Sequence, residues 1–396
     1  MKRRAVLTAL PLALAGVSVS GRLLAAPAGG AKLLVVFLRG GYDCANALVP
    51  YASPFYYESR PTIAIRAGAA DDPHLALPLD ASWALAPALK AAFGPLWRSG
   101  ELAILPFAGT DDLSRSHFET QDDIELGLAA NAGHRFGSGF MARLAAALTG
   151  ARPIAFTSGL PMTFAGLADV PSIAVREAGR APLDPAASAL YRELYRGTPL
   201  AGAVNEGLNL RAEVAADLAQ EMKDAGRKGA TARGFADDAT RIGTLMKDGY
   251  SLGFVDLGGW DTHVNEGGAD GALARNLASL GDGLVALKAA LGSDWARTTV
   301  VVLSEFGRTF RENGNRGTDH GHGSVYFVLG GGVRGGRIVG RQVAVARGQL
   351  FQDRDYPVLN NYRDVLGGLF AGQFGLSARA VDAVFPGAKP QALGLV

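Results

Sequence analysis

The expected fold follows from one stretch of the chain, Leu33-Leu34-Val35-Val36-Phe37-Leu38, which runs straight into Arg39-Gly40-Gly41. Six consecutive apolar residues indicate a strand that is buried on both faces, because a half-exposed strand would alternate apolar and polar residues. Strands of this kind are typical of parallel sheets with helices on both sides. The stretch therefore predicts the first strand of an α/β sheet.

Similar apolar runs recur along the chain, and segments with helical periodicity separate them. The further runs lie at 102–107, 153–156, 251–257, 298–303 and 325–329. The helical patterns lie at 118–128, 188–224, 236–249, 272–291 and 360–374. This alternation predicts an α/β fold with an open, mostly parallel sheet flanked by helices. We find no convincing linker, so we expect a single domain over residues 29–396.

Residues 1–28 have the organisation of an export signal. Lys2-Arg3-Arg4 forms a charged start, a weakly apolar stretch follows, and Ala26-Pro27-Ala28 offers a small-residue cleavage site. The paired arginines favour the twin-arginine route, which predicts a periplasmic or secreted protein. An uncleaved anchor is the alternative, although the run is shorter than the ~20 apolar residues that a membrane span needs. We expect no membrane span after the signal is removed.

Charge and cysteine content exclude some classes of protein. The formal net charge is +2 and becomes −2 without residues 1–28, which hold four basic residues and no acid. No Lys/Arg-rich stripe appears elsewhere, so we expect no nucleic-acid partner. The single cysteine, Cys44, excludes an internal disulfide and is expected to be a small buried side chain.

Residues with metal-binding chemistry follow the predicted strands. The chain has six histidines, and four of them, His117, His263, His320 and His322, lie in these loops. In an open parallel sheet, ligands bind beyond the carboxyl ends of the strands. Asp261 precedes His263 by two positions, and in an extended segment this spacing puts both side chains on the same side. The loops therefore predict a metal site.

The segment Asp319-His320-Gly321-His322 suggests a second pair of chelating imidazoles. Imidazole and carboxylate together suit zinc, which we favour as the divalent metal, with manganese, iron or calcium as alternatives. Such an ion polarises a phosphoryl or sulfuryl oxygen. The competing interpretation is that the loop histidines cap turns and that Asp261 bonds its own backbone.

Four residues are candidates for catalysis, namely Ser116, His117, Glu305 and Arg308. Glu305 follows the predicted strand 298–303 and is a candidate ligand or base, and Arg308 is a candidate anion clamp. A surface Glu–Arg pair is the alternative for these two. Ser116, followed by His117, opens a predicted helix, where a serine gains acidity and oxyanions bind. Ser116 is therefore a candidate nucleophile, with an ordinary helix N-cap as the alternative.

Taken together, these motifs resemble the bacterial family called domain of unknown function 1501. That family is a twin-arginine-exported group placed near the alkaline phosphatase and sulfatase superfamily. The resemblance spans nearly the whole chain and rests on 37–43, 116–118 with Gln121, 259–263, 304–308 and 317–321, with 362–364 and 385–387 completing it. The family itself has no assigned activity.

The resemblance implies an alkaline phosphatase-like sheet with two metals and a Ser/Thr nucleophile at a helix start. By position, Asp43 resembles the ligand after the first strand, and Ser116 resembles the nucleophile. Asp261 and His263 resemble the ligand pair of one metal, and His320 falls where a later histidine ligand stands.

The chain departs from the superfamily pattern in two ways. One residue separates Asp261 from His263, where the superfamily has three. Glu305-Phe306 replaces an Asp-His pair, so one histidine ligand is missing from its place, and His117 or His322 could substitute for it. Loss of one or both metals is therefore an open alternative.

Three functions remain. The first is a metal-dependent hydrolase of phosphate or sulfate esters, in which Ser116 attacks, Asp261, His263 and His320 hold the metal, and Arg308 holds the small anionic substrate. The second is a non-catalytic, metal-stabilised protein that binds a carbohydrate or a co-exported protein. The third is a metal hydrolase without a covalent intermediate, in which Glu305 is the base.

Overall fold

The protein is described by a computed structural model, which covers residues 30–69, 71–130, 137–174, 185–202, 204–205, 208–209 and 234–396. The predicted export signal lies outside the described residues. So does much of the predicted helical stretch 188–224, of which the structure describes residues in the helix α5 (Pro185–Leu194) and shortly after it.

The predicted strands form one central sheet. Their order is β10-β5-β9-β8-β1-β7-β6, and β11 also pairs with β5. The bounds are β1 Lys32–Leu38, β5 Leu102–Gly109, β6 Pro153–Ala155, β7 Leu252–Leu257, β8 Thr298–Ser304, β9 Ser324–Leu329, β10 Arg337–Ile338 and β11 Asn360–Asn361. The central strand β1 pairs in parallel with β7 and β8, which confirms the expected α/β class with a mostly parallel sheet.

Strand β9 runs antiparallel to both of its neighbours, β8 and β5. Parallel neighbours need a crossover connection, and this is usually a helix. The described residues 305–323 between β8 and β9 contain no helix, so the chain reverses at the same edge of the sheet. The apolar run at 325–329 predicted this strand but not its direction, because burial on both faces leaves the same pattern in either case.

Helices cover both faces of the sheet. The larger ones are α2 Pro87–Arg98, α3 His117–Leu126, α4 Phe140–Ala147, α7 Phe235–Asp248, α8 Ala272–Leu291, α9 Tyr362–Phe374 and α10 Ala378–Val384. The short elements are α1 Pro54–Ser59, three 3-10 turns (Cys44–Asn46, Met162–Phe164 and Gly292–Arg297) and a small sheet of β2 Leu48–Val49, β4 Ala84–Leu85 and β3 Leu77–Pro78. None of the helices among the described residues combines the length and the hydropathy that a membrane span needs.

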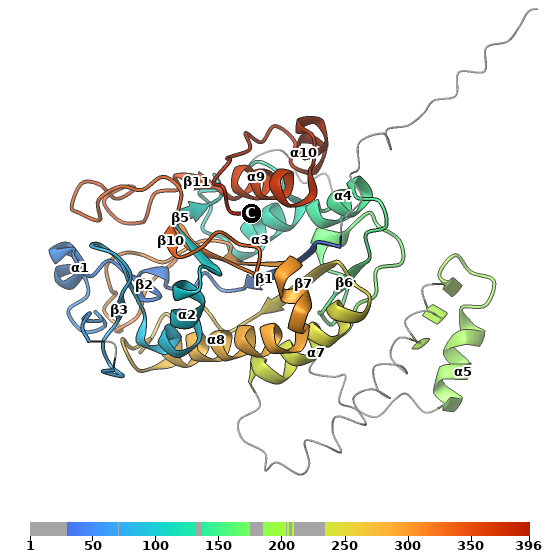
Figure 1. The fold of residues 1–396 in the computed structure, drawn as a ribbon, viewed down its shortest axis with the longest axis horizontal. Helices are drawn as coiled ribbons and strands as arrows, with labels where there is room; N and C mark the ends of the chain where they lie inside the picture. Colours follow the sequence, from blue (N-terminus) through green and yellow to red (C-terminus); the bar gives the residue numbers. More distant parts are fainter. Residues whose placement is uncertain are drawn as a thin grey trace, which may run out of the picture.

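The side chains of β1 alternate between two buried cores, as the two-residue repeat of a strand requires. Leu34, Val36 and Leu38 belong to the core that includes residues of α2, α7 and α8. The odd-numbered residues 33, 35 and 37 belong to the core that includes residues of α4, α9 and α10. Figure 1 shows α7 and α8 below the sheet and α4, α9 and α10 above it.

The loops that carry the predicted site residues gather at one edge of the sheet. Strands β1, β7 and β8 are parallel and therefore end at this edge, while the reversed strand β9 begins there. Strand β5 is antiparallel to β9, so it also ends at the same edge. This topology brings together segments that lie far apart in the chain, from the loop of Asp43 to the loop of His322.

The packing of α8 gives a prediction about stability. Leu284 is fully buried, whereas its neighbour Val285 is 44% exposed. Leu284→Ala should lower the free energy of unfolding by about 2–5 kcal/mol, because it leaves a cavity between α8 and the sheet. Val285→Ala should change it by less than about 0.5 kcal/mol. Urea unfolding followed by circular dichroism measures both variants, and equal losses would contradict this packing.

Candidate metal centre

Imidazole and carboxylate groups from three loops meet at this edge. His117 begins α3, Asp261 and His263 follow β7, and His320 precedes β9. The Nε2 atom of His320 lies 2.9 Å from Nε2 of His117 and 3.1 Å from Nε2 of His263. The Oδ1 atom of Asp261 lies 2.9 Å from Nε2 of His263 and 3.3 Å from Nε2 of His320. The structure thus places together the residues that the sequence separates.

The hydrogen bonds at the outer nitrogens fix how two of these rings are protonated. The Nδ1 atom of His117 lies 2.8 Å from Oε1 of Glu305, and that of His320 lies 3.1 Å from the carbonyl oxygen of Arg115. Since both partners only accept hydrogen bonds, each Nδ1 carries a proton, and in a neutral ring Nε2 then has a lone pair. Two lone pairs facing each other at 2.9 Å repel, so either a proton on one Nε2 or a metal cation has to lie between the rings.

The donor set fits a divalent cation. His117, Asp261 and His320 each offer a ligand atom, and these atoms all lie within 4.8 Å of one another. Tetrahedral zinc with bonds of about 2.0–2.1 Å would separate its ligand atoms by about 3.3 Å, close to the spacings seen here. The group could therefore hold such an ion, and His263 is a candidate fourth ligand because two of these donors are its neighbours.

Glu305 stands behind His117 and is completely buried. Its Oε1 atom accepts hydrogen bonds from the Gly40 amide at 2.8 Å and from Gln121 at 2.7 Å, in addition to His117, while Oε2 accepts from Ser304 at 2.8 Å. Burial acts to raise the pKa of Glu305, but these hydrogen bonds outweigh it and lower the pKa. A carboxylate held in this way orients a metal-ligating histidine. To act as the predicted ligand or base, it would have to give up one of these bonds.

Arg308 is buried and directs its guanidinium away from solvent. It donates to the carbonyl oxygens of Gly40, Gly41 and Thr318, and to Oδ1 of Asp261. Burial acts to raise the pKa of Asp261, but the hydrogen bond and charge of Arg308 outweigh it and lower the pKa. These hydrogen bonds hold the ligand loops together. They leave no donor of Arg308 directed at a substrate, which the predicted anion clamp would need.

Asp43 lies outside the cluster, in a fully buried ion pair. Both of its carboxylate oxygens accept hydrogen bonds from Arg60, one of them at 2.9 Å. The chain turns at Gly40 and Gly41, which both have positive φ, and Asp43 then caps the 3-10 turn Cys44–Asn46. This turn directs the carboxylate into the core, so Asp43 could become the expected ligand only by leaving Arg60. Cys44 is buried, which confirms the expectation of a small buried side chain.

A second buried acid lies next to this ion pair. Glu266 is fully buried, and its Oε2 atom accepts a hydrogen bond of 2.7 Å from the hydroxyl of Thr318. Burial, together with the negative charge of Asp43, raises the pKa of Glu266 to about 9. Glu266 is therefore a neutral carboxylic acid at pH 7. It joins the loop after β7 to the loop before β9 without adding a charge to the core.

Asp319 and His322 flank His320 in sequence, yet neither is among the clustered donors described above. Asp319 accepts hydrogen bonds from Asn313 at 3.0 Å and from Nδ1 of His263 at 3.3 Å, so it orients a candidate ligand. The ring of His322 is buried and packs against Phe351. Burial and the charge of Arg115 lower the pKa of His322 to about 4, which keeps the ring neutral.

Ser116 caps α3, and its hydroxyl accepts a long hydrogen bond of 3.5 Å from the Glu119 amide. It stands between two residues that contact the cluster: the carbonyl of Arg115 bonds His320, and His117 is itself a donor. Arg115 has a positive φ of 54°, an unusual conformation for a non-glycine residue that clusters at functional sites. The residues on both sides of Ser116 therefore contact the cluster, while its own hydroxyl caps the helix.

Some residues of the site were not predicted to have a role in it. Gln121 links Glu305 to Arg39, which also pairs with Asp256 and Glu125. Gln121 and Arg39 were both part of the family motifs, and this was the one sign that pointed to them. The contribution of Arg115 comes from its backbone carbonyl, which no residue type can reveal.

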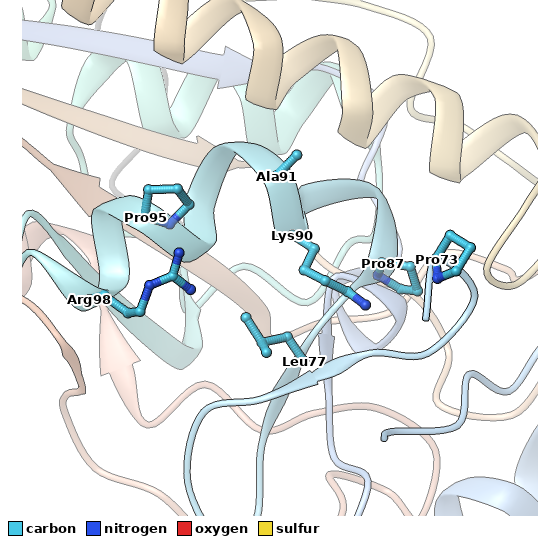
Figure 2. A pocket seen from close by; sticks show the side chains of 7 residues that line it. All are labelled: Pro73, Leu77, Pro87, Lys90, Ala91, Pro95 and Arg98. Carbon is cyan, nitrogen blue, oxygen red and sulfur yellow. The ribbon is translucent and has the colours of Figure 1, made fainter. Parts of the chain in front are cut away.

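A separate hollow lies beside α2 and has a volume of about 470 Å³. Figure 2 shows Leu77, Lys90, Pro95 and Arg98 among the side chains that line it. None of the clustered donors contributes to it. The metal-binding geometry, and not this hollow, therefore marks the candidate site.

The fold and the cluster define an α/β protein with a candidate divalent-cation centre. The chain belongs to the family described as "Protein of unknown function (DUF1501)", whose profile matches residues 31–385. No curated protein matches the sequence. Two solved structures are similar at a TM-score of 0.37, one of Ps i-CgsB in complex with k-i-k-neocarrahexaose at 9% identity and one of Ps i-CgsB at 10%. Each alignment covers 91% of this chain and 75% of the other.

Metal titration tests the donor set. His117→Ala, Asp261→Asn and His320→Ala should each weaken zinc binding at pH 7 by at least about 100-fold, because each removes a ligand atom, whereas outer-shell changes cost about 10–100-fold. The matched control is His322→Ala, which removes a buried histidine two residues after the ligand His320. It should leave the zinc affinity within about threefold of the native value. Zinc binding that survives all three ligand changes would contradict the site.

Unfolding at two pH values tests the neutral state of Glu266. Its folded pKa of about 9 lies above the ordinary 4.5, so the unfolded chain releases this proton first and stability falls as pH rises from 4.5 to 9. Glu266→Gln removes that loss. The melting temperature of the variant relative to the native protein should therefore be higher at pH 8 than at pH 5. The exposed Glu119→Gln is the control, and an equal or reversed difference would show that Glu266 is ionised in the fold.

Proposed function

We propose that this protein is an exported, metal-dependent hydrolase of small phosphate or sulfate esters. The observation that supports the proposal most is the pair of imidazole Nε2 atoms, of His117 and His320, that lie 2.9 Å apart beside Asp261. A structural zinc site is usually closed by four protein ligands, whereas a catalytic site has three and an open position. The three grouped donors match the catalytic type if His263 stays outside the first coordination sphere.

The metal would be held by His117, Asp261 and His320, with His263 as the further candidate. Zinc is the metal that this donor set favours. When bound, such an ion stabilises negative charge that develops on the ester oxygens. Among the described residues one such group is found, so the proposal rests on one ion and not on the pair that the superfamily resemblance implies.

Ser116 is the proposed nucleophile. Its oxygen would form the new bond to phosphorus or sulfur while the bond to the alcohol breaks, and the serine proton would leave with the alcohol. Water would then cleave the serine ester, which restores the hydroxyl and releases phosphate or sulfate. The start of α3 supports the role, because free amides at a helix N-terminus favour an oxyanion.

In this proposal Arg308 and Glu305 position the metal ligands and do not contact the substrate. Arg308 holds Asp261 and the loop carbonyls, and Glu305 holds the His117 ring through Nδ1. The alternative role of Glu305 as a general base has less support, because four donors already occupy its oxygens. Export by the twin-arginine route is part of the proposal and rests on the pattern of residues 1–28.

Substitution of Ser116 tests the covalent route. The metal-loaded protein should turn over an aryl phosphate or an aryl sulfate, and Ser116→Ala should lower kcat at least about 100-fold. Ser116→Asn is the matched variant, since asparagine also caps a helix but provides no hydroxyl. It should be as stable as the native protein and as inactive as Ser116→Ala in a continuous nitrophenol assay.

Two other results of the ester assay would contradict parts of the proposal. Full activity in Ser116→Asn would exclude the serine ester and favour attack by water. No turnover of either ester class by protein that contains stoichiometric metal would contradict the hydrolase proposal and favour the non-catalytic alternative, in which the metal stabilises a binding protein.

A further inference from the structure

Large apolar side chains are exposed around the candidate centre. In the described part of the chain outside residues 185–202, five such side chains are exposed, and four of them lie in loops or a first helical turn at the site edge of the sheet. They are Leu113 (52% exposed), Phe118 (85%), Leu160 (50%) and Val264 (58%). The fifth, Val285, lies on α8. We call the four residues the apolar rim.

The rim residues are tied to the cluster by the chain itself. Phe118 directly follows His117, and Val264 directly follows His263. Leu113 belongs to the same loop as Arg115, whose carbonyl oxygen binds the ring of His320. Leu160 follows β6, which is parallel to β7 and ends at the same edge. Three of the four rim residues therefore belong to segments that contact the centre.

The inner side of the centre is also apolar. The ring of Phe306 packs against His117 and His320 with centroid distances of 4.9 and 5.1 Å, and it is almost completely buried. A phenylalanine exposed to 85% is unfavourable in water, because it leaves most of a large hydrophobic surface hydrated. Single exposed apolar residues need no explanation, but four of them on the segments that end at one edge of the sheet suggest a binding surface there.

The charges around the centre do not suit a ligand with many negative groups. Arg115, Arg308 and Arg354 all donate to carboxylates or carbonyl oxygens of the protein. The side chains of Asp261 and Asp319 remain 46% and 56% exposed and would repel further anionic groups. One bound cation can balance a single anionic group, so the remainder of the substrate should be uncharged.

We infer that the apolar rim binds the alcohol part of the substrate, and that the substrate class is a phosphate or sulfate monoester of an apolar alcohol, with an alkyl chain or aromatic ring. This inference rests on the proposed function and specifies its substrate. Phe118 and Val264 are the residues that set specificity. Neither of them is part of the ligand set, so their effect should be on substrate binding and not on the metal.

Binding of two alkyl phosphates to the metal-loaded, full-length mature protein tests the inference without any turnover. Octyl phosphate, below its micelle concentration, should bind at least about tenfold more tightly than methyl phosphate, because each buried methylene contributes about fourfold. Phe118→Ala should remove most of this ratio and Phe118→Leu should keep part of it, with methyl phosphate affinity and zinc content unchanged. Val285→Ala, the exposed control on α8, should keep the full ratio.

The outcomes separate this inference from the proposed function. Equal affinity for the two phosphates, or a ratio that Phe118→Ala leaves intact, overturns the apolar rim even if esters are hydrolysed. A preference for octyl phosphate that depends on Phe118 supports the rim, and if no ester is then hydrolysed, only the hydrolase proposal fails.

Discussion

The buried guanidinium of Arg308 is the contact on which the candidate centre depends. It binds the carbonyl oxygens after β1, the carboxylate of Asp261 after β7 and the carbonyl of Thr318 before β9. Parallel strands bring these loops to one edge, but a sheet alone does not set their relative positions to within an ångström. A planar, permanently charged group with five fixed donors can do so. Gly40 is part of the same arrangement, because a Cβ there would lie 2.7 Å from the Asp261 amide.

The sequence was informative where a physical signal repeats over many residues. The apolar runs predicted six of the eight strands of the central sheet, and the periodic leucines predicted a helix at 272–291, the bounds that α8 has in the structure. The two-residue strands β2, β3, β4, β10 and β11 were not predicted, because a pattern that short has no period to detect. The direction of β9 was also beyond reach, since a strand buried on both faces looks the same in either orientation.

For the site, residue type predicted which chemistry was present but not which partner each side chain would find. His263, His320 and Asp261 were expected together, and the structure brings them together. His117 was expected beside a catalytic serine or as a replacement for the missing histidine ligand, and it lies among the donors. His322 has the same side chain as His320 and is two residues away, yet a buried environment next to Phe351 holds it apart. Contacts between distant segments decide such differences, and a single sequence does not encode them locally.

The position of Asp43 shows how the charge of a buried carboxylate can be balanced without a second metal ion. The superfamily resemblance placed a metal ligand here, and an isolated buried carboxylate would indeed require a cation. In this chain the cation is the guanidinium of Arg60, which binds both carboxylate oxygens. The neighbouring Glu266 would add a second negative charge, but it stays protonated at neutral pH. One guanidinium therefore balances one carboxylate in the core. Asp43, Arg60 and protonated Glu266 together leave no charge that would require a second ion beside them.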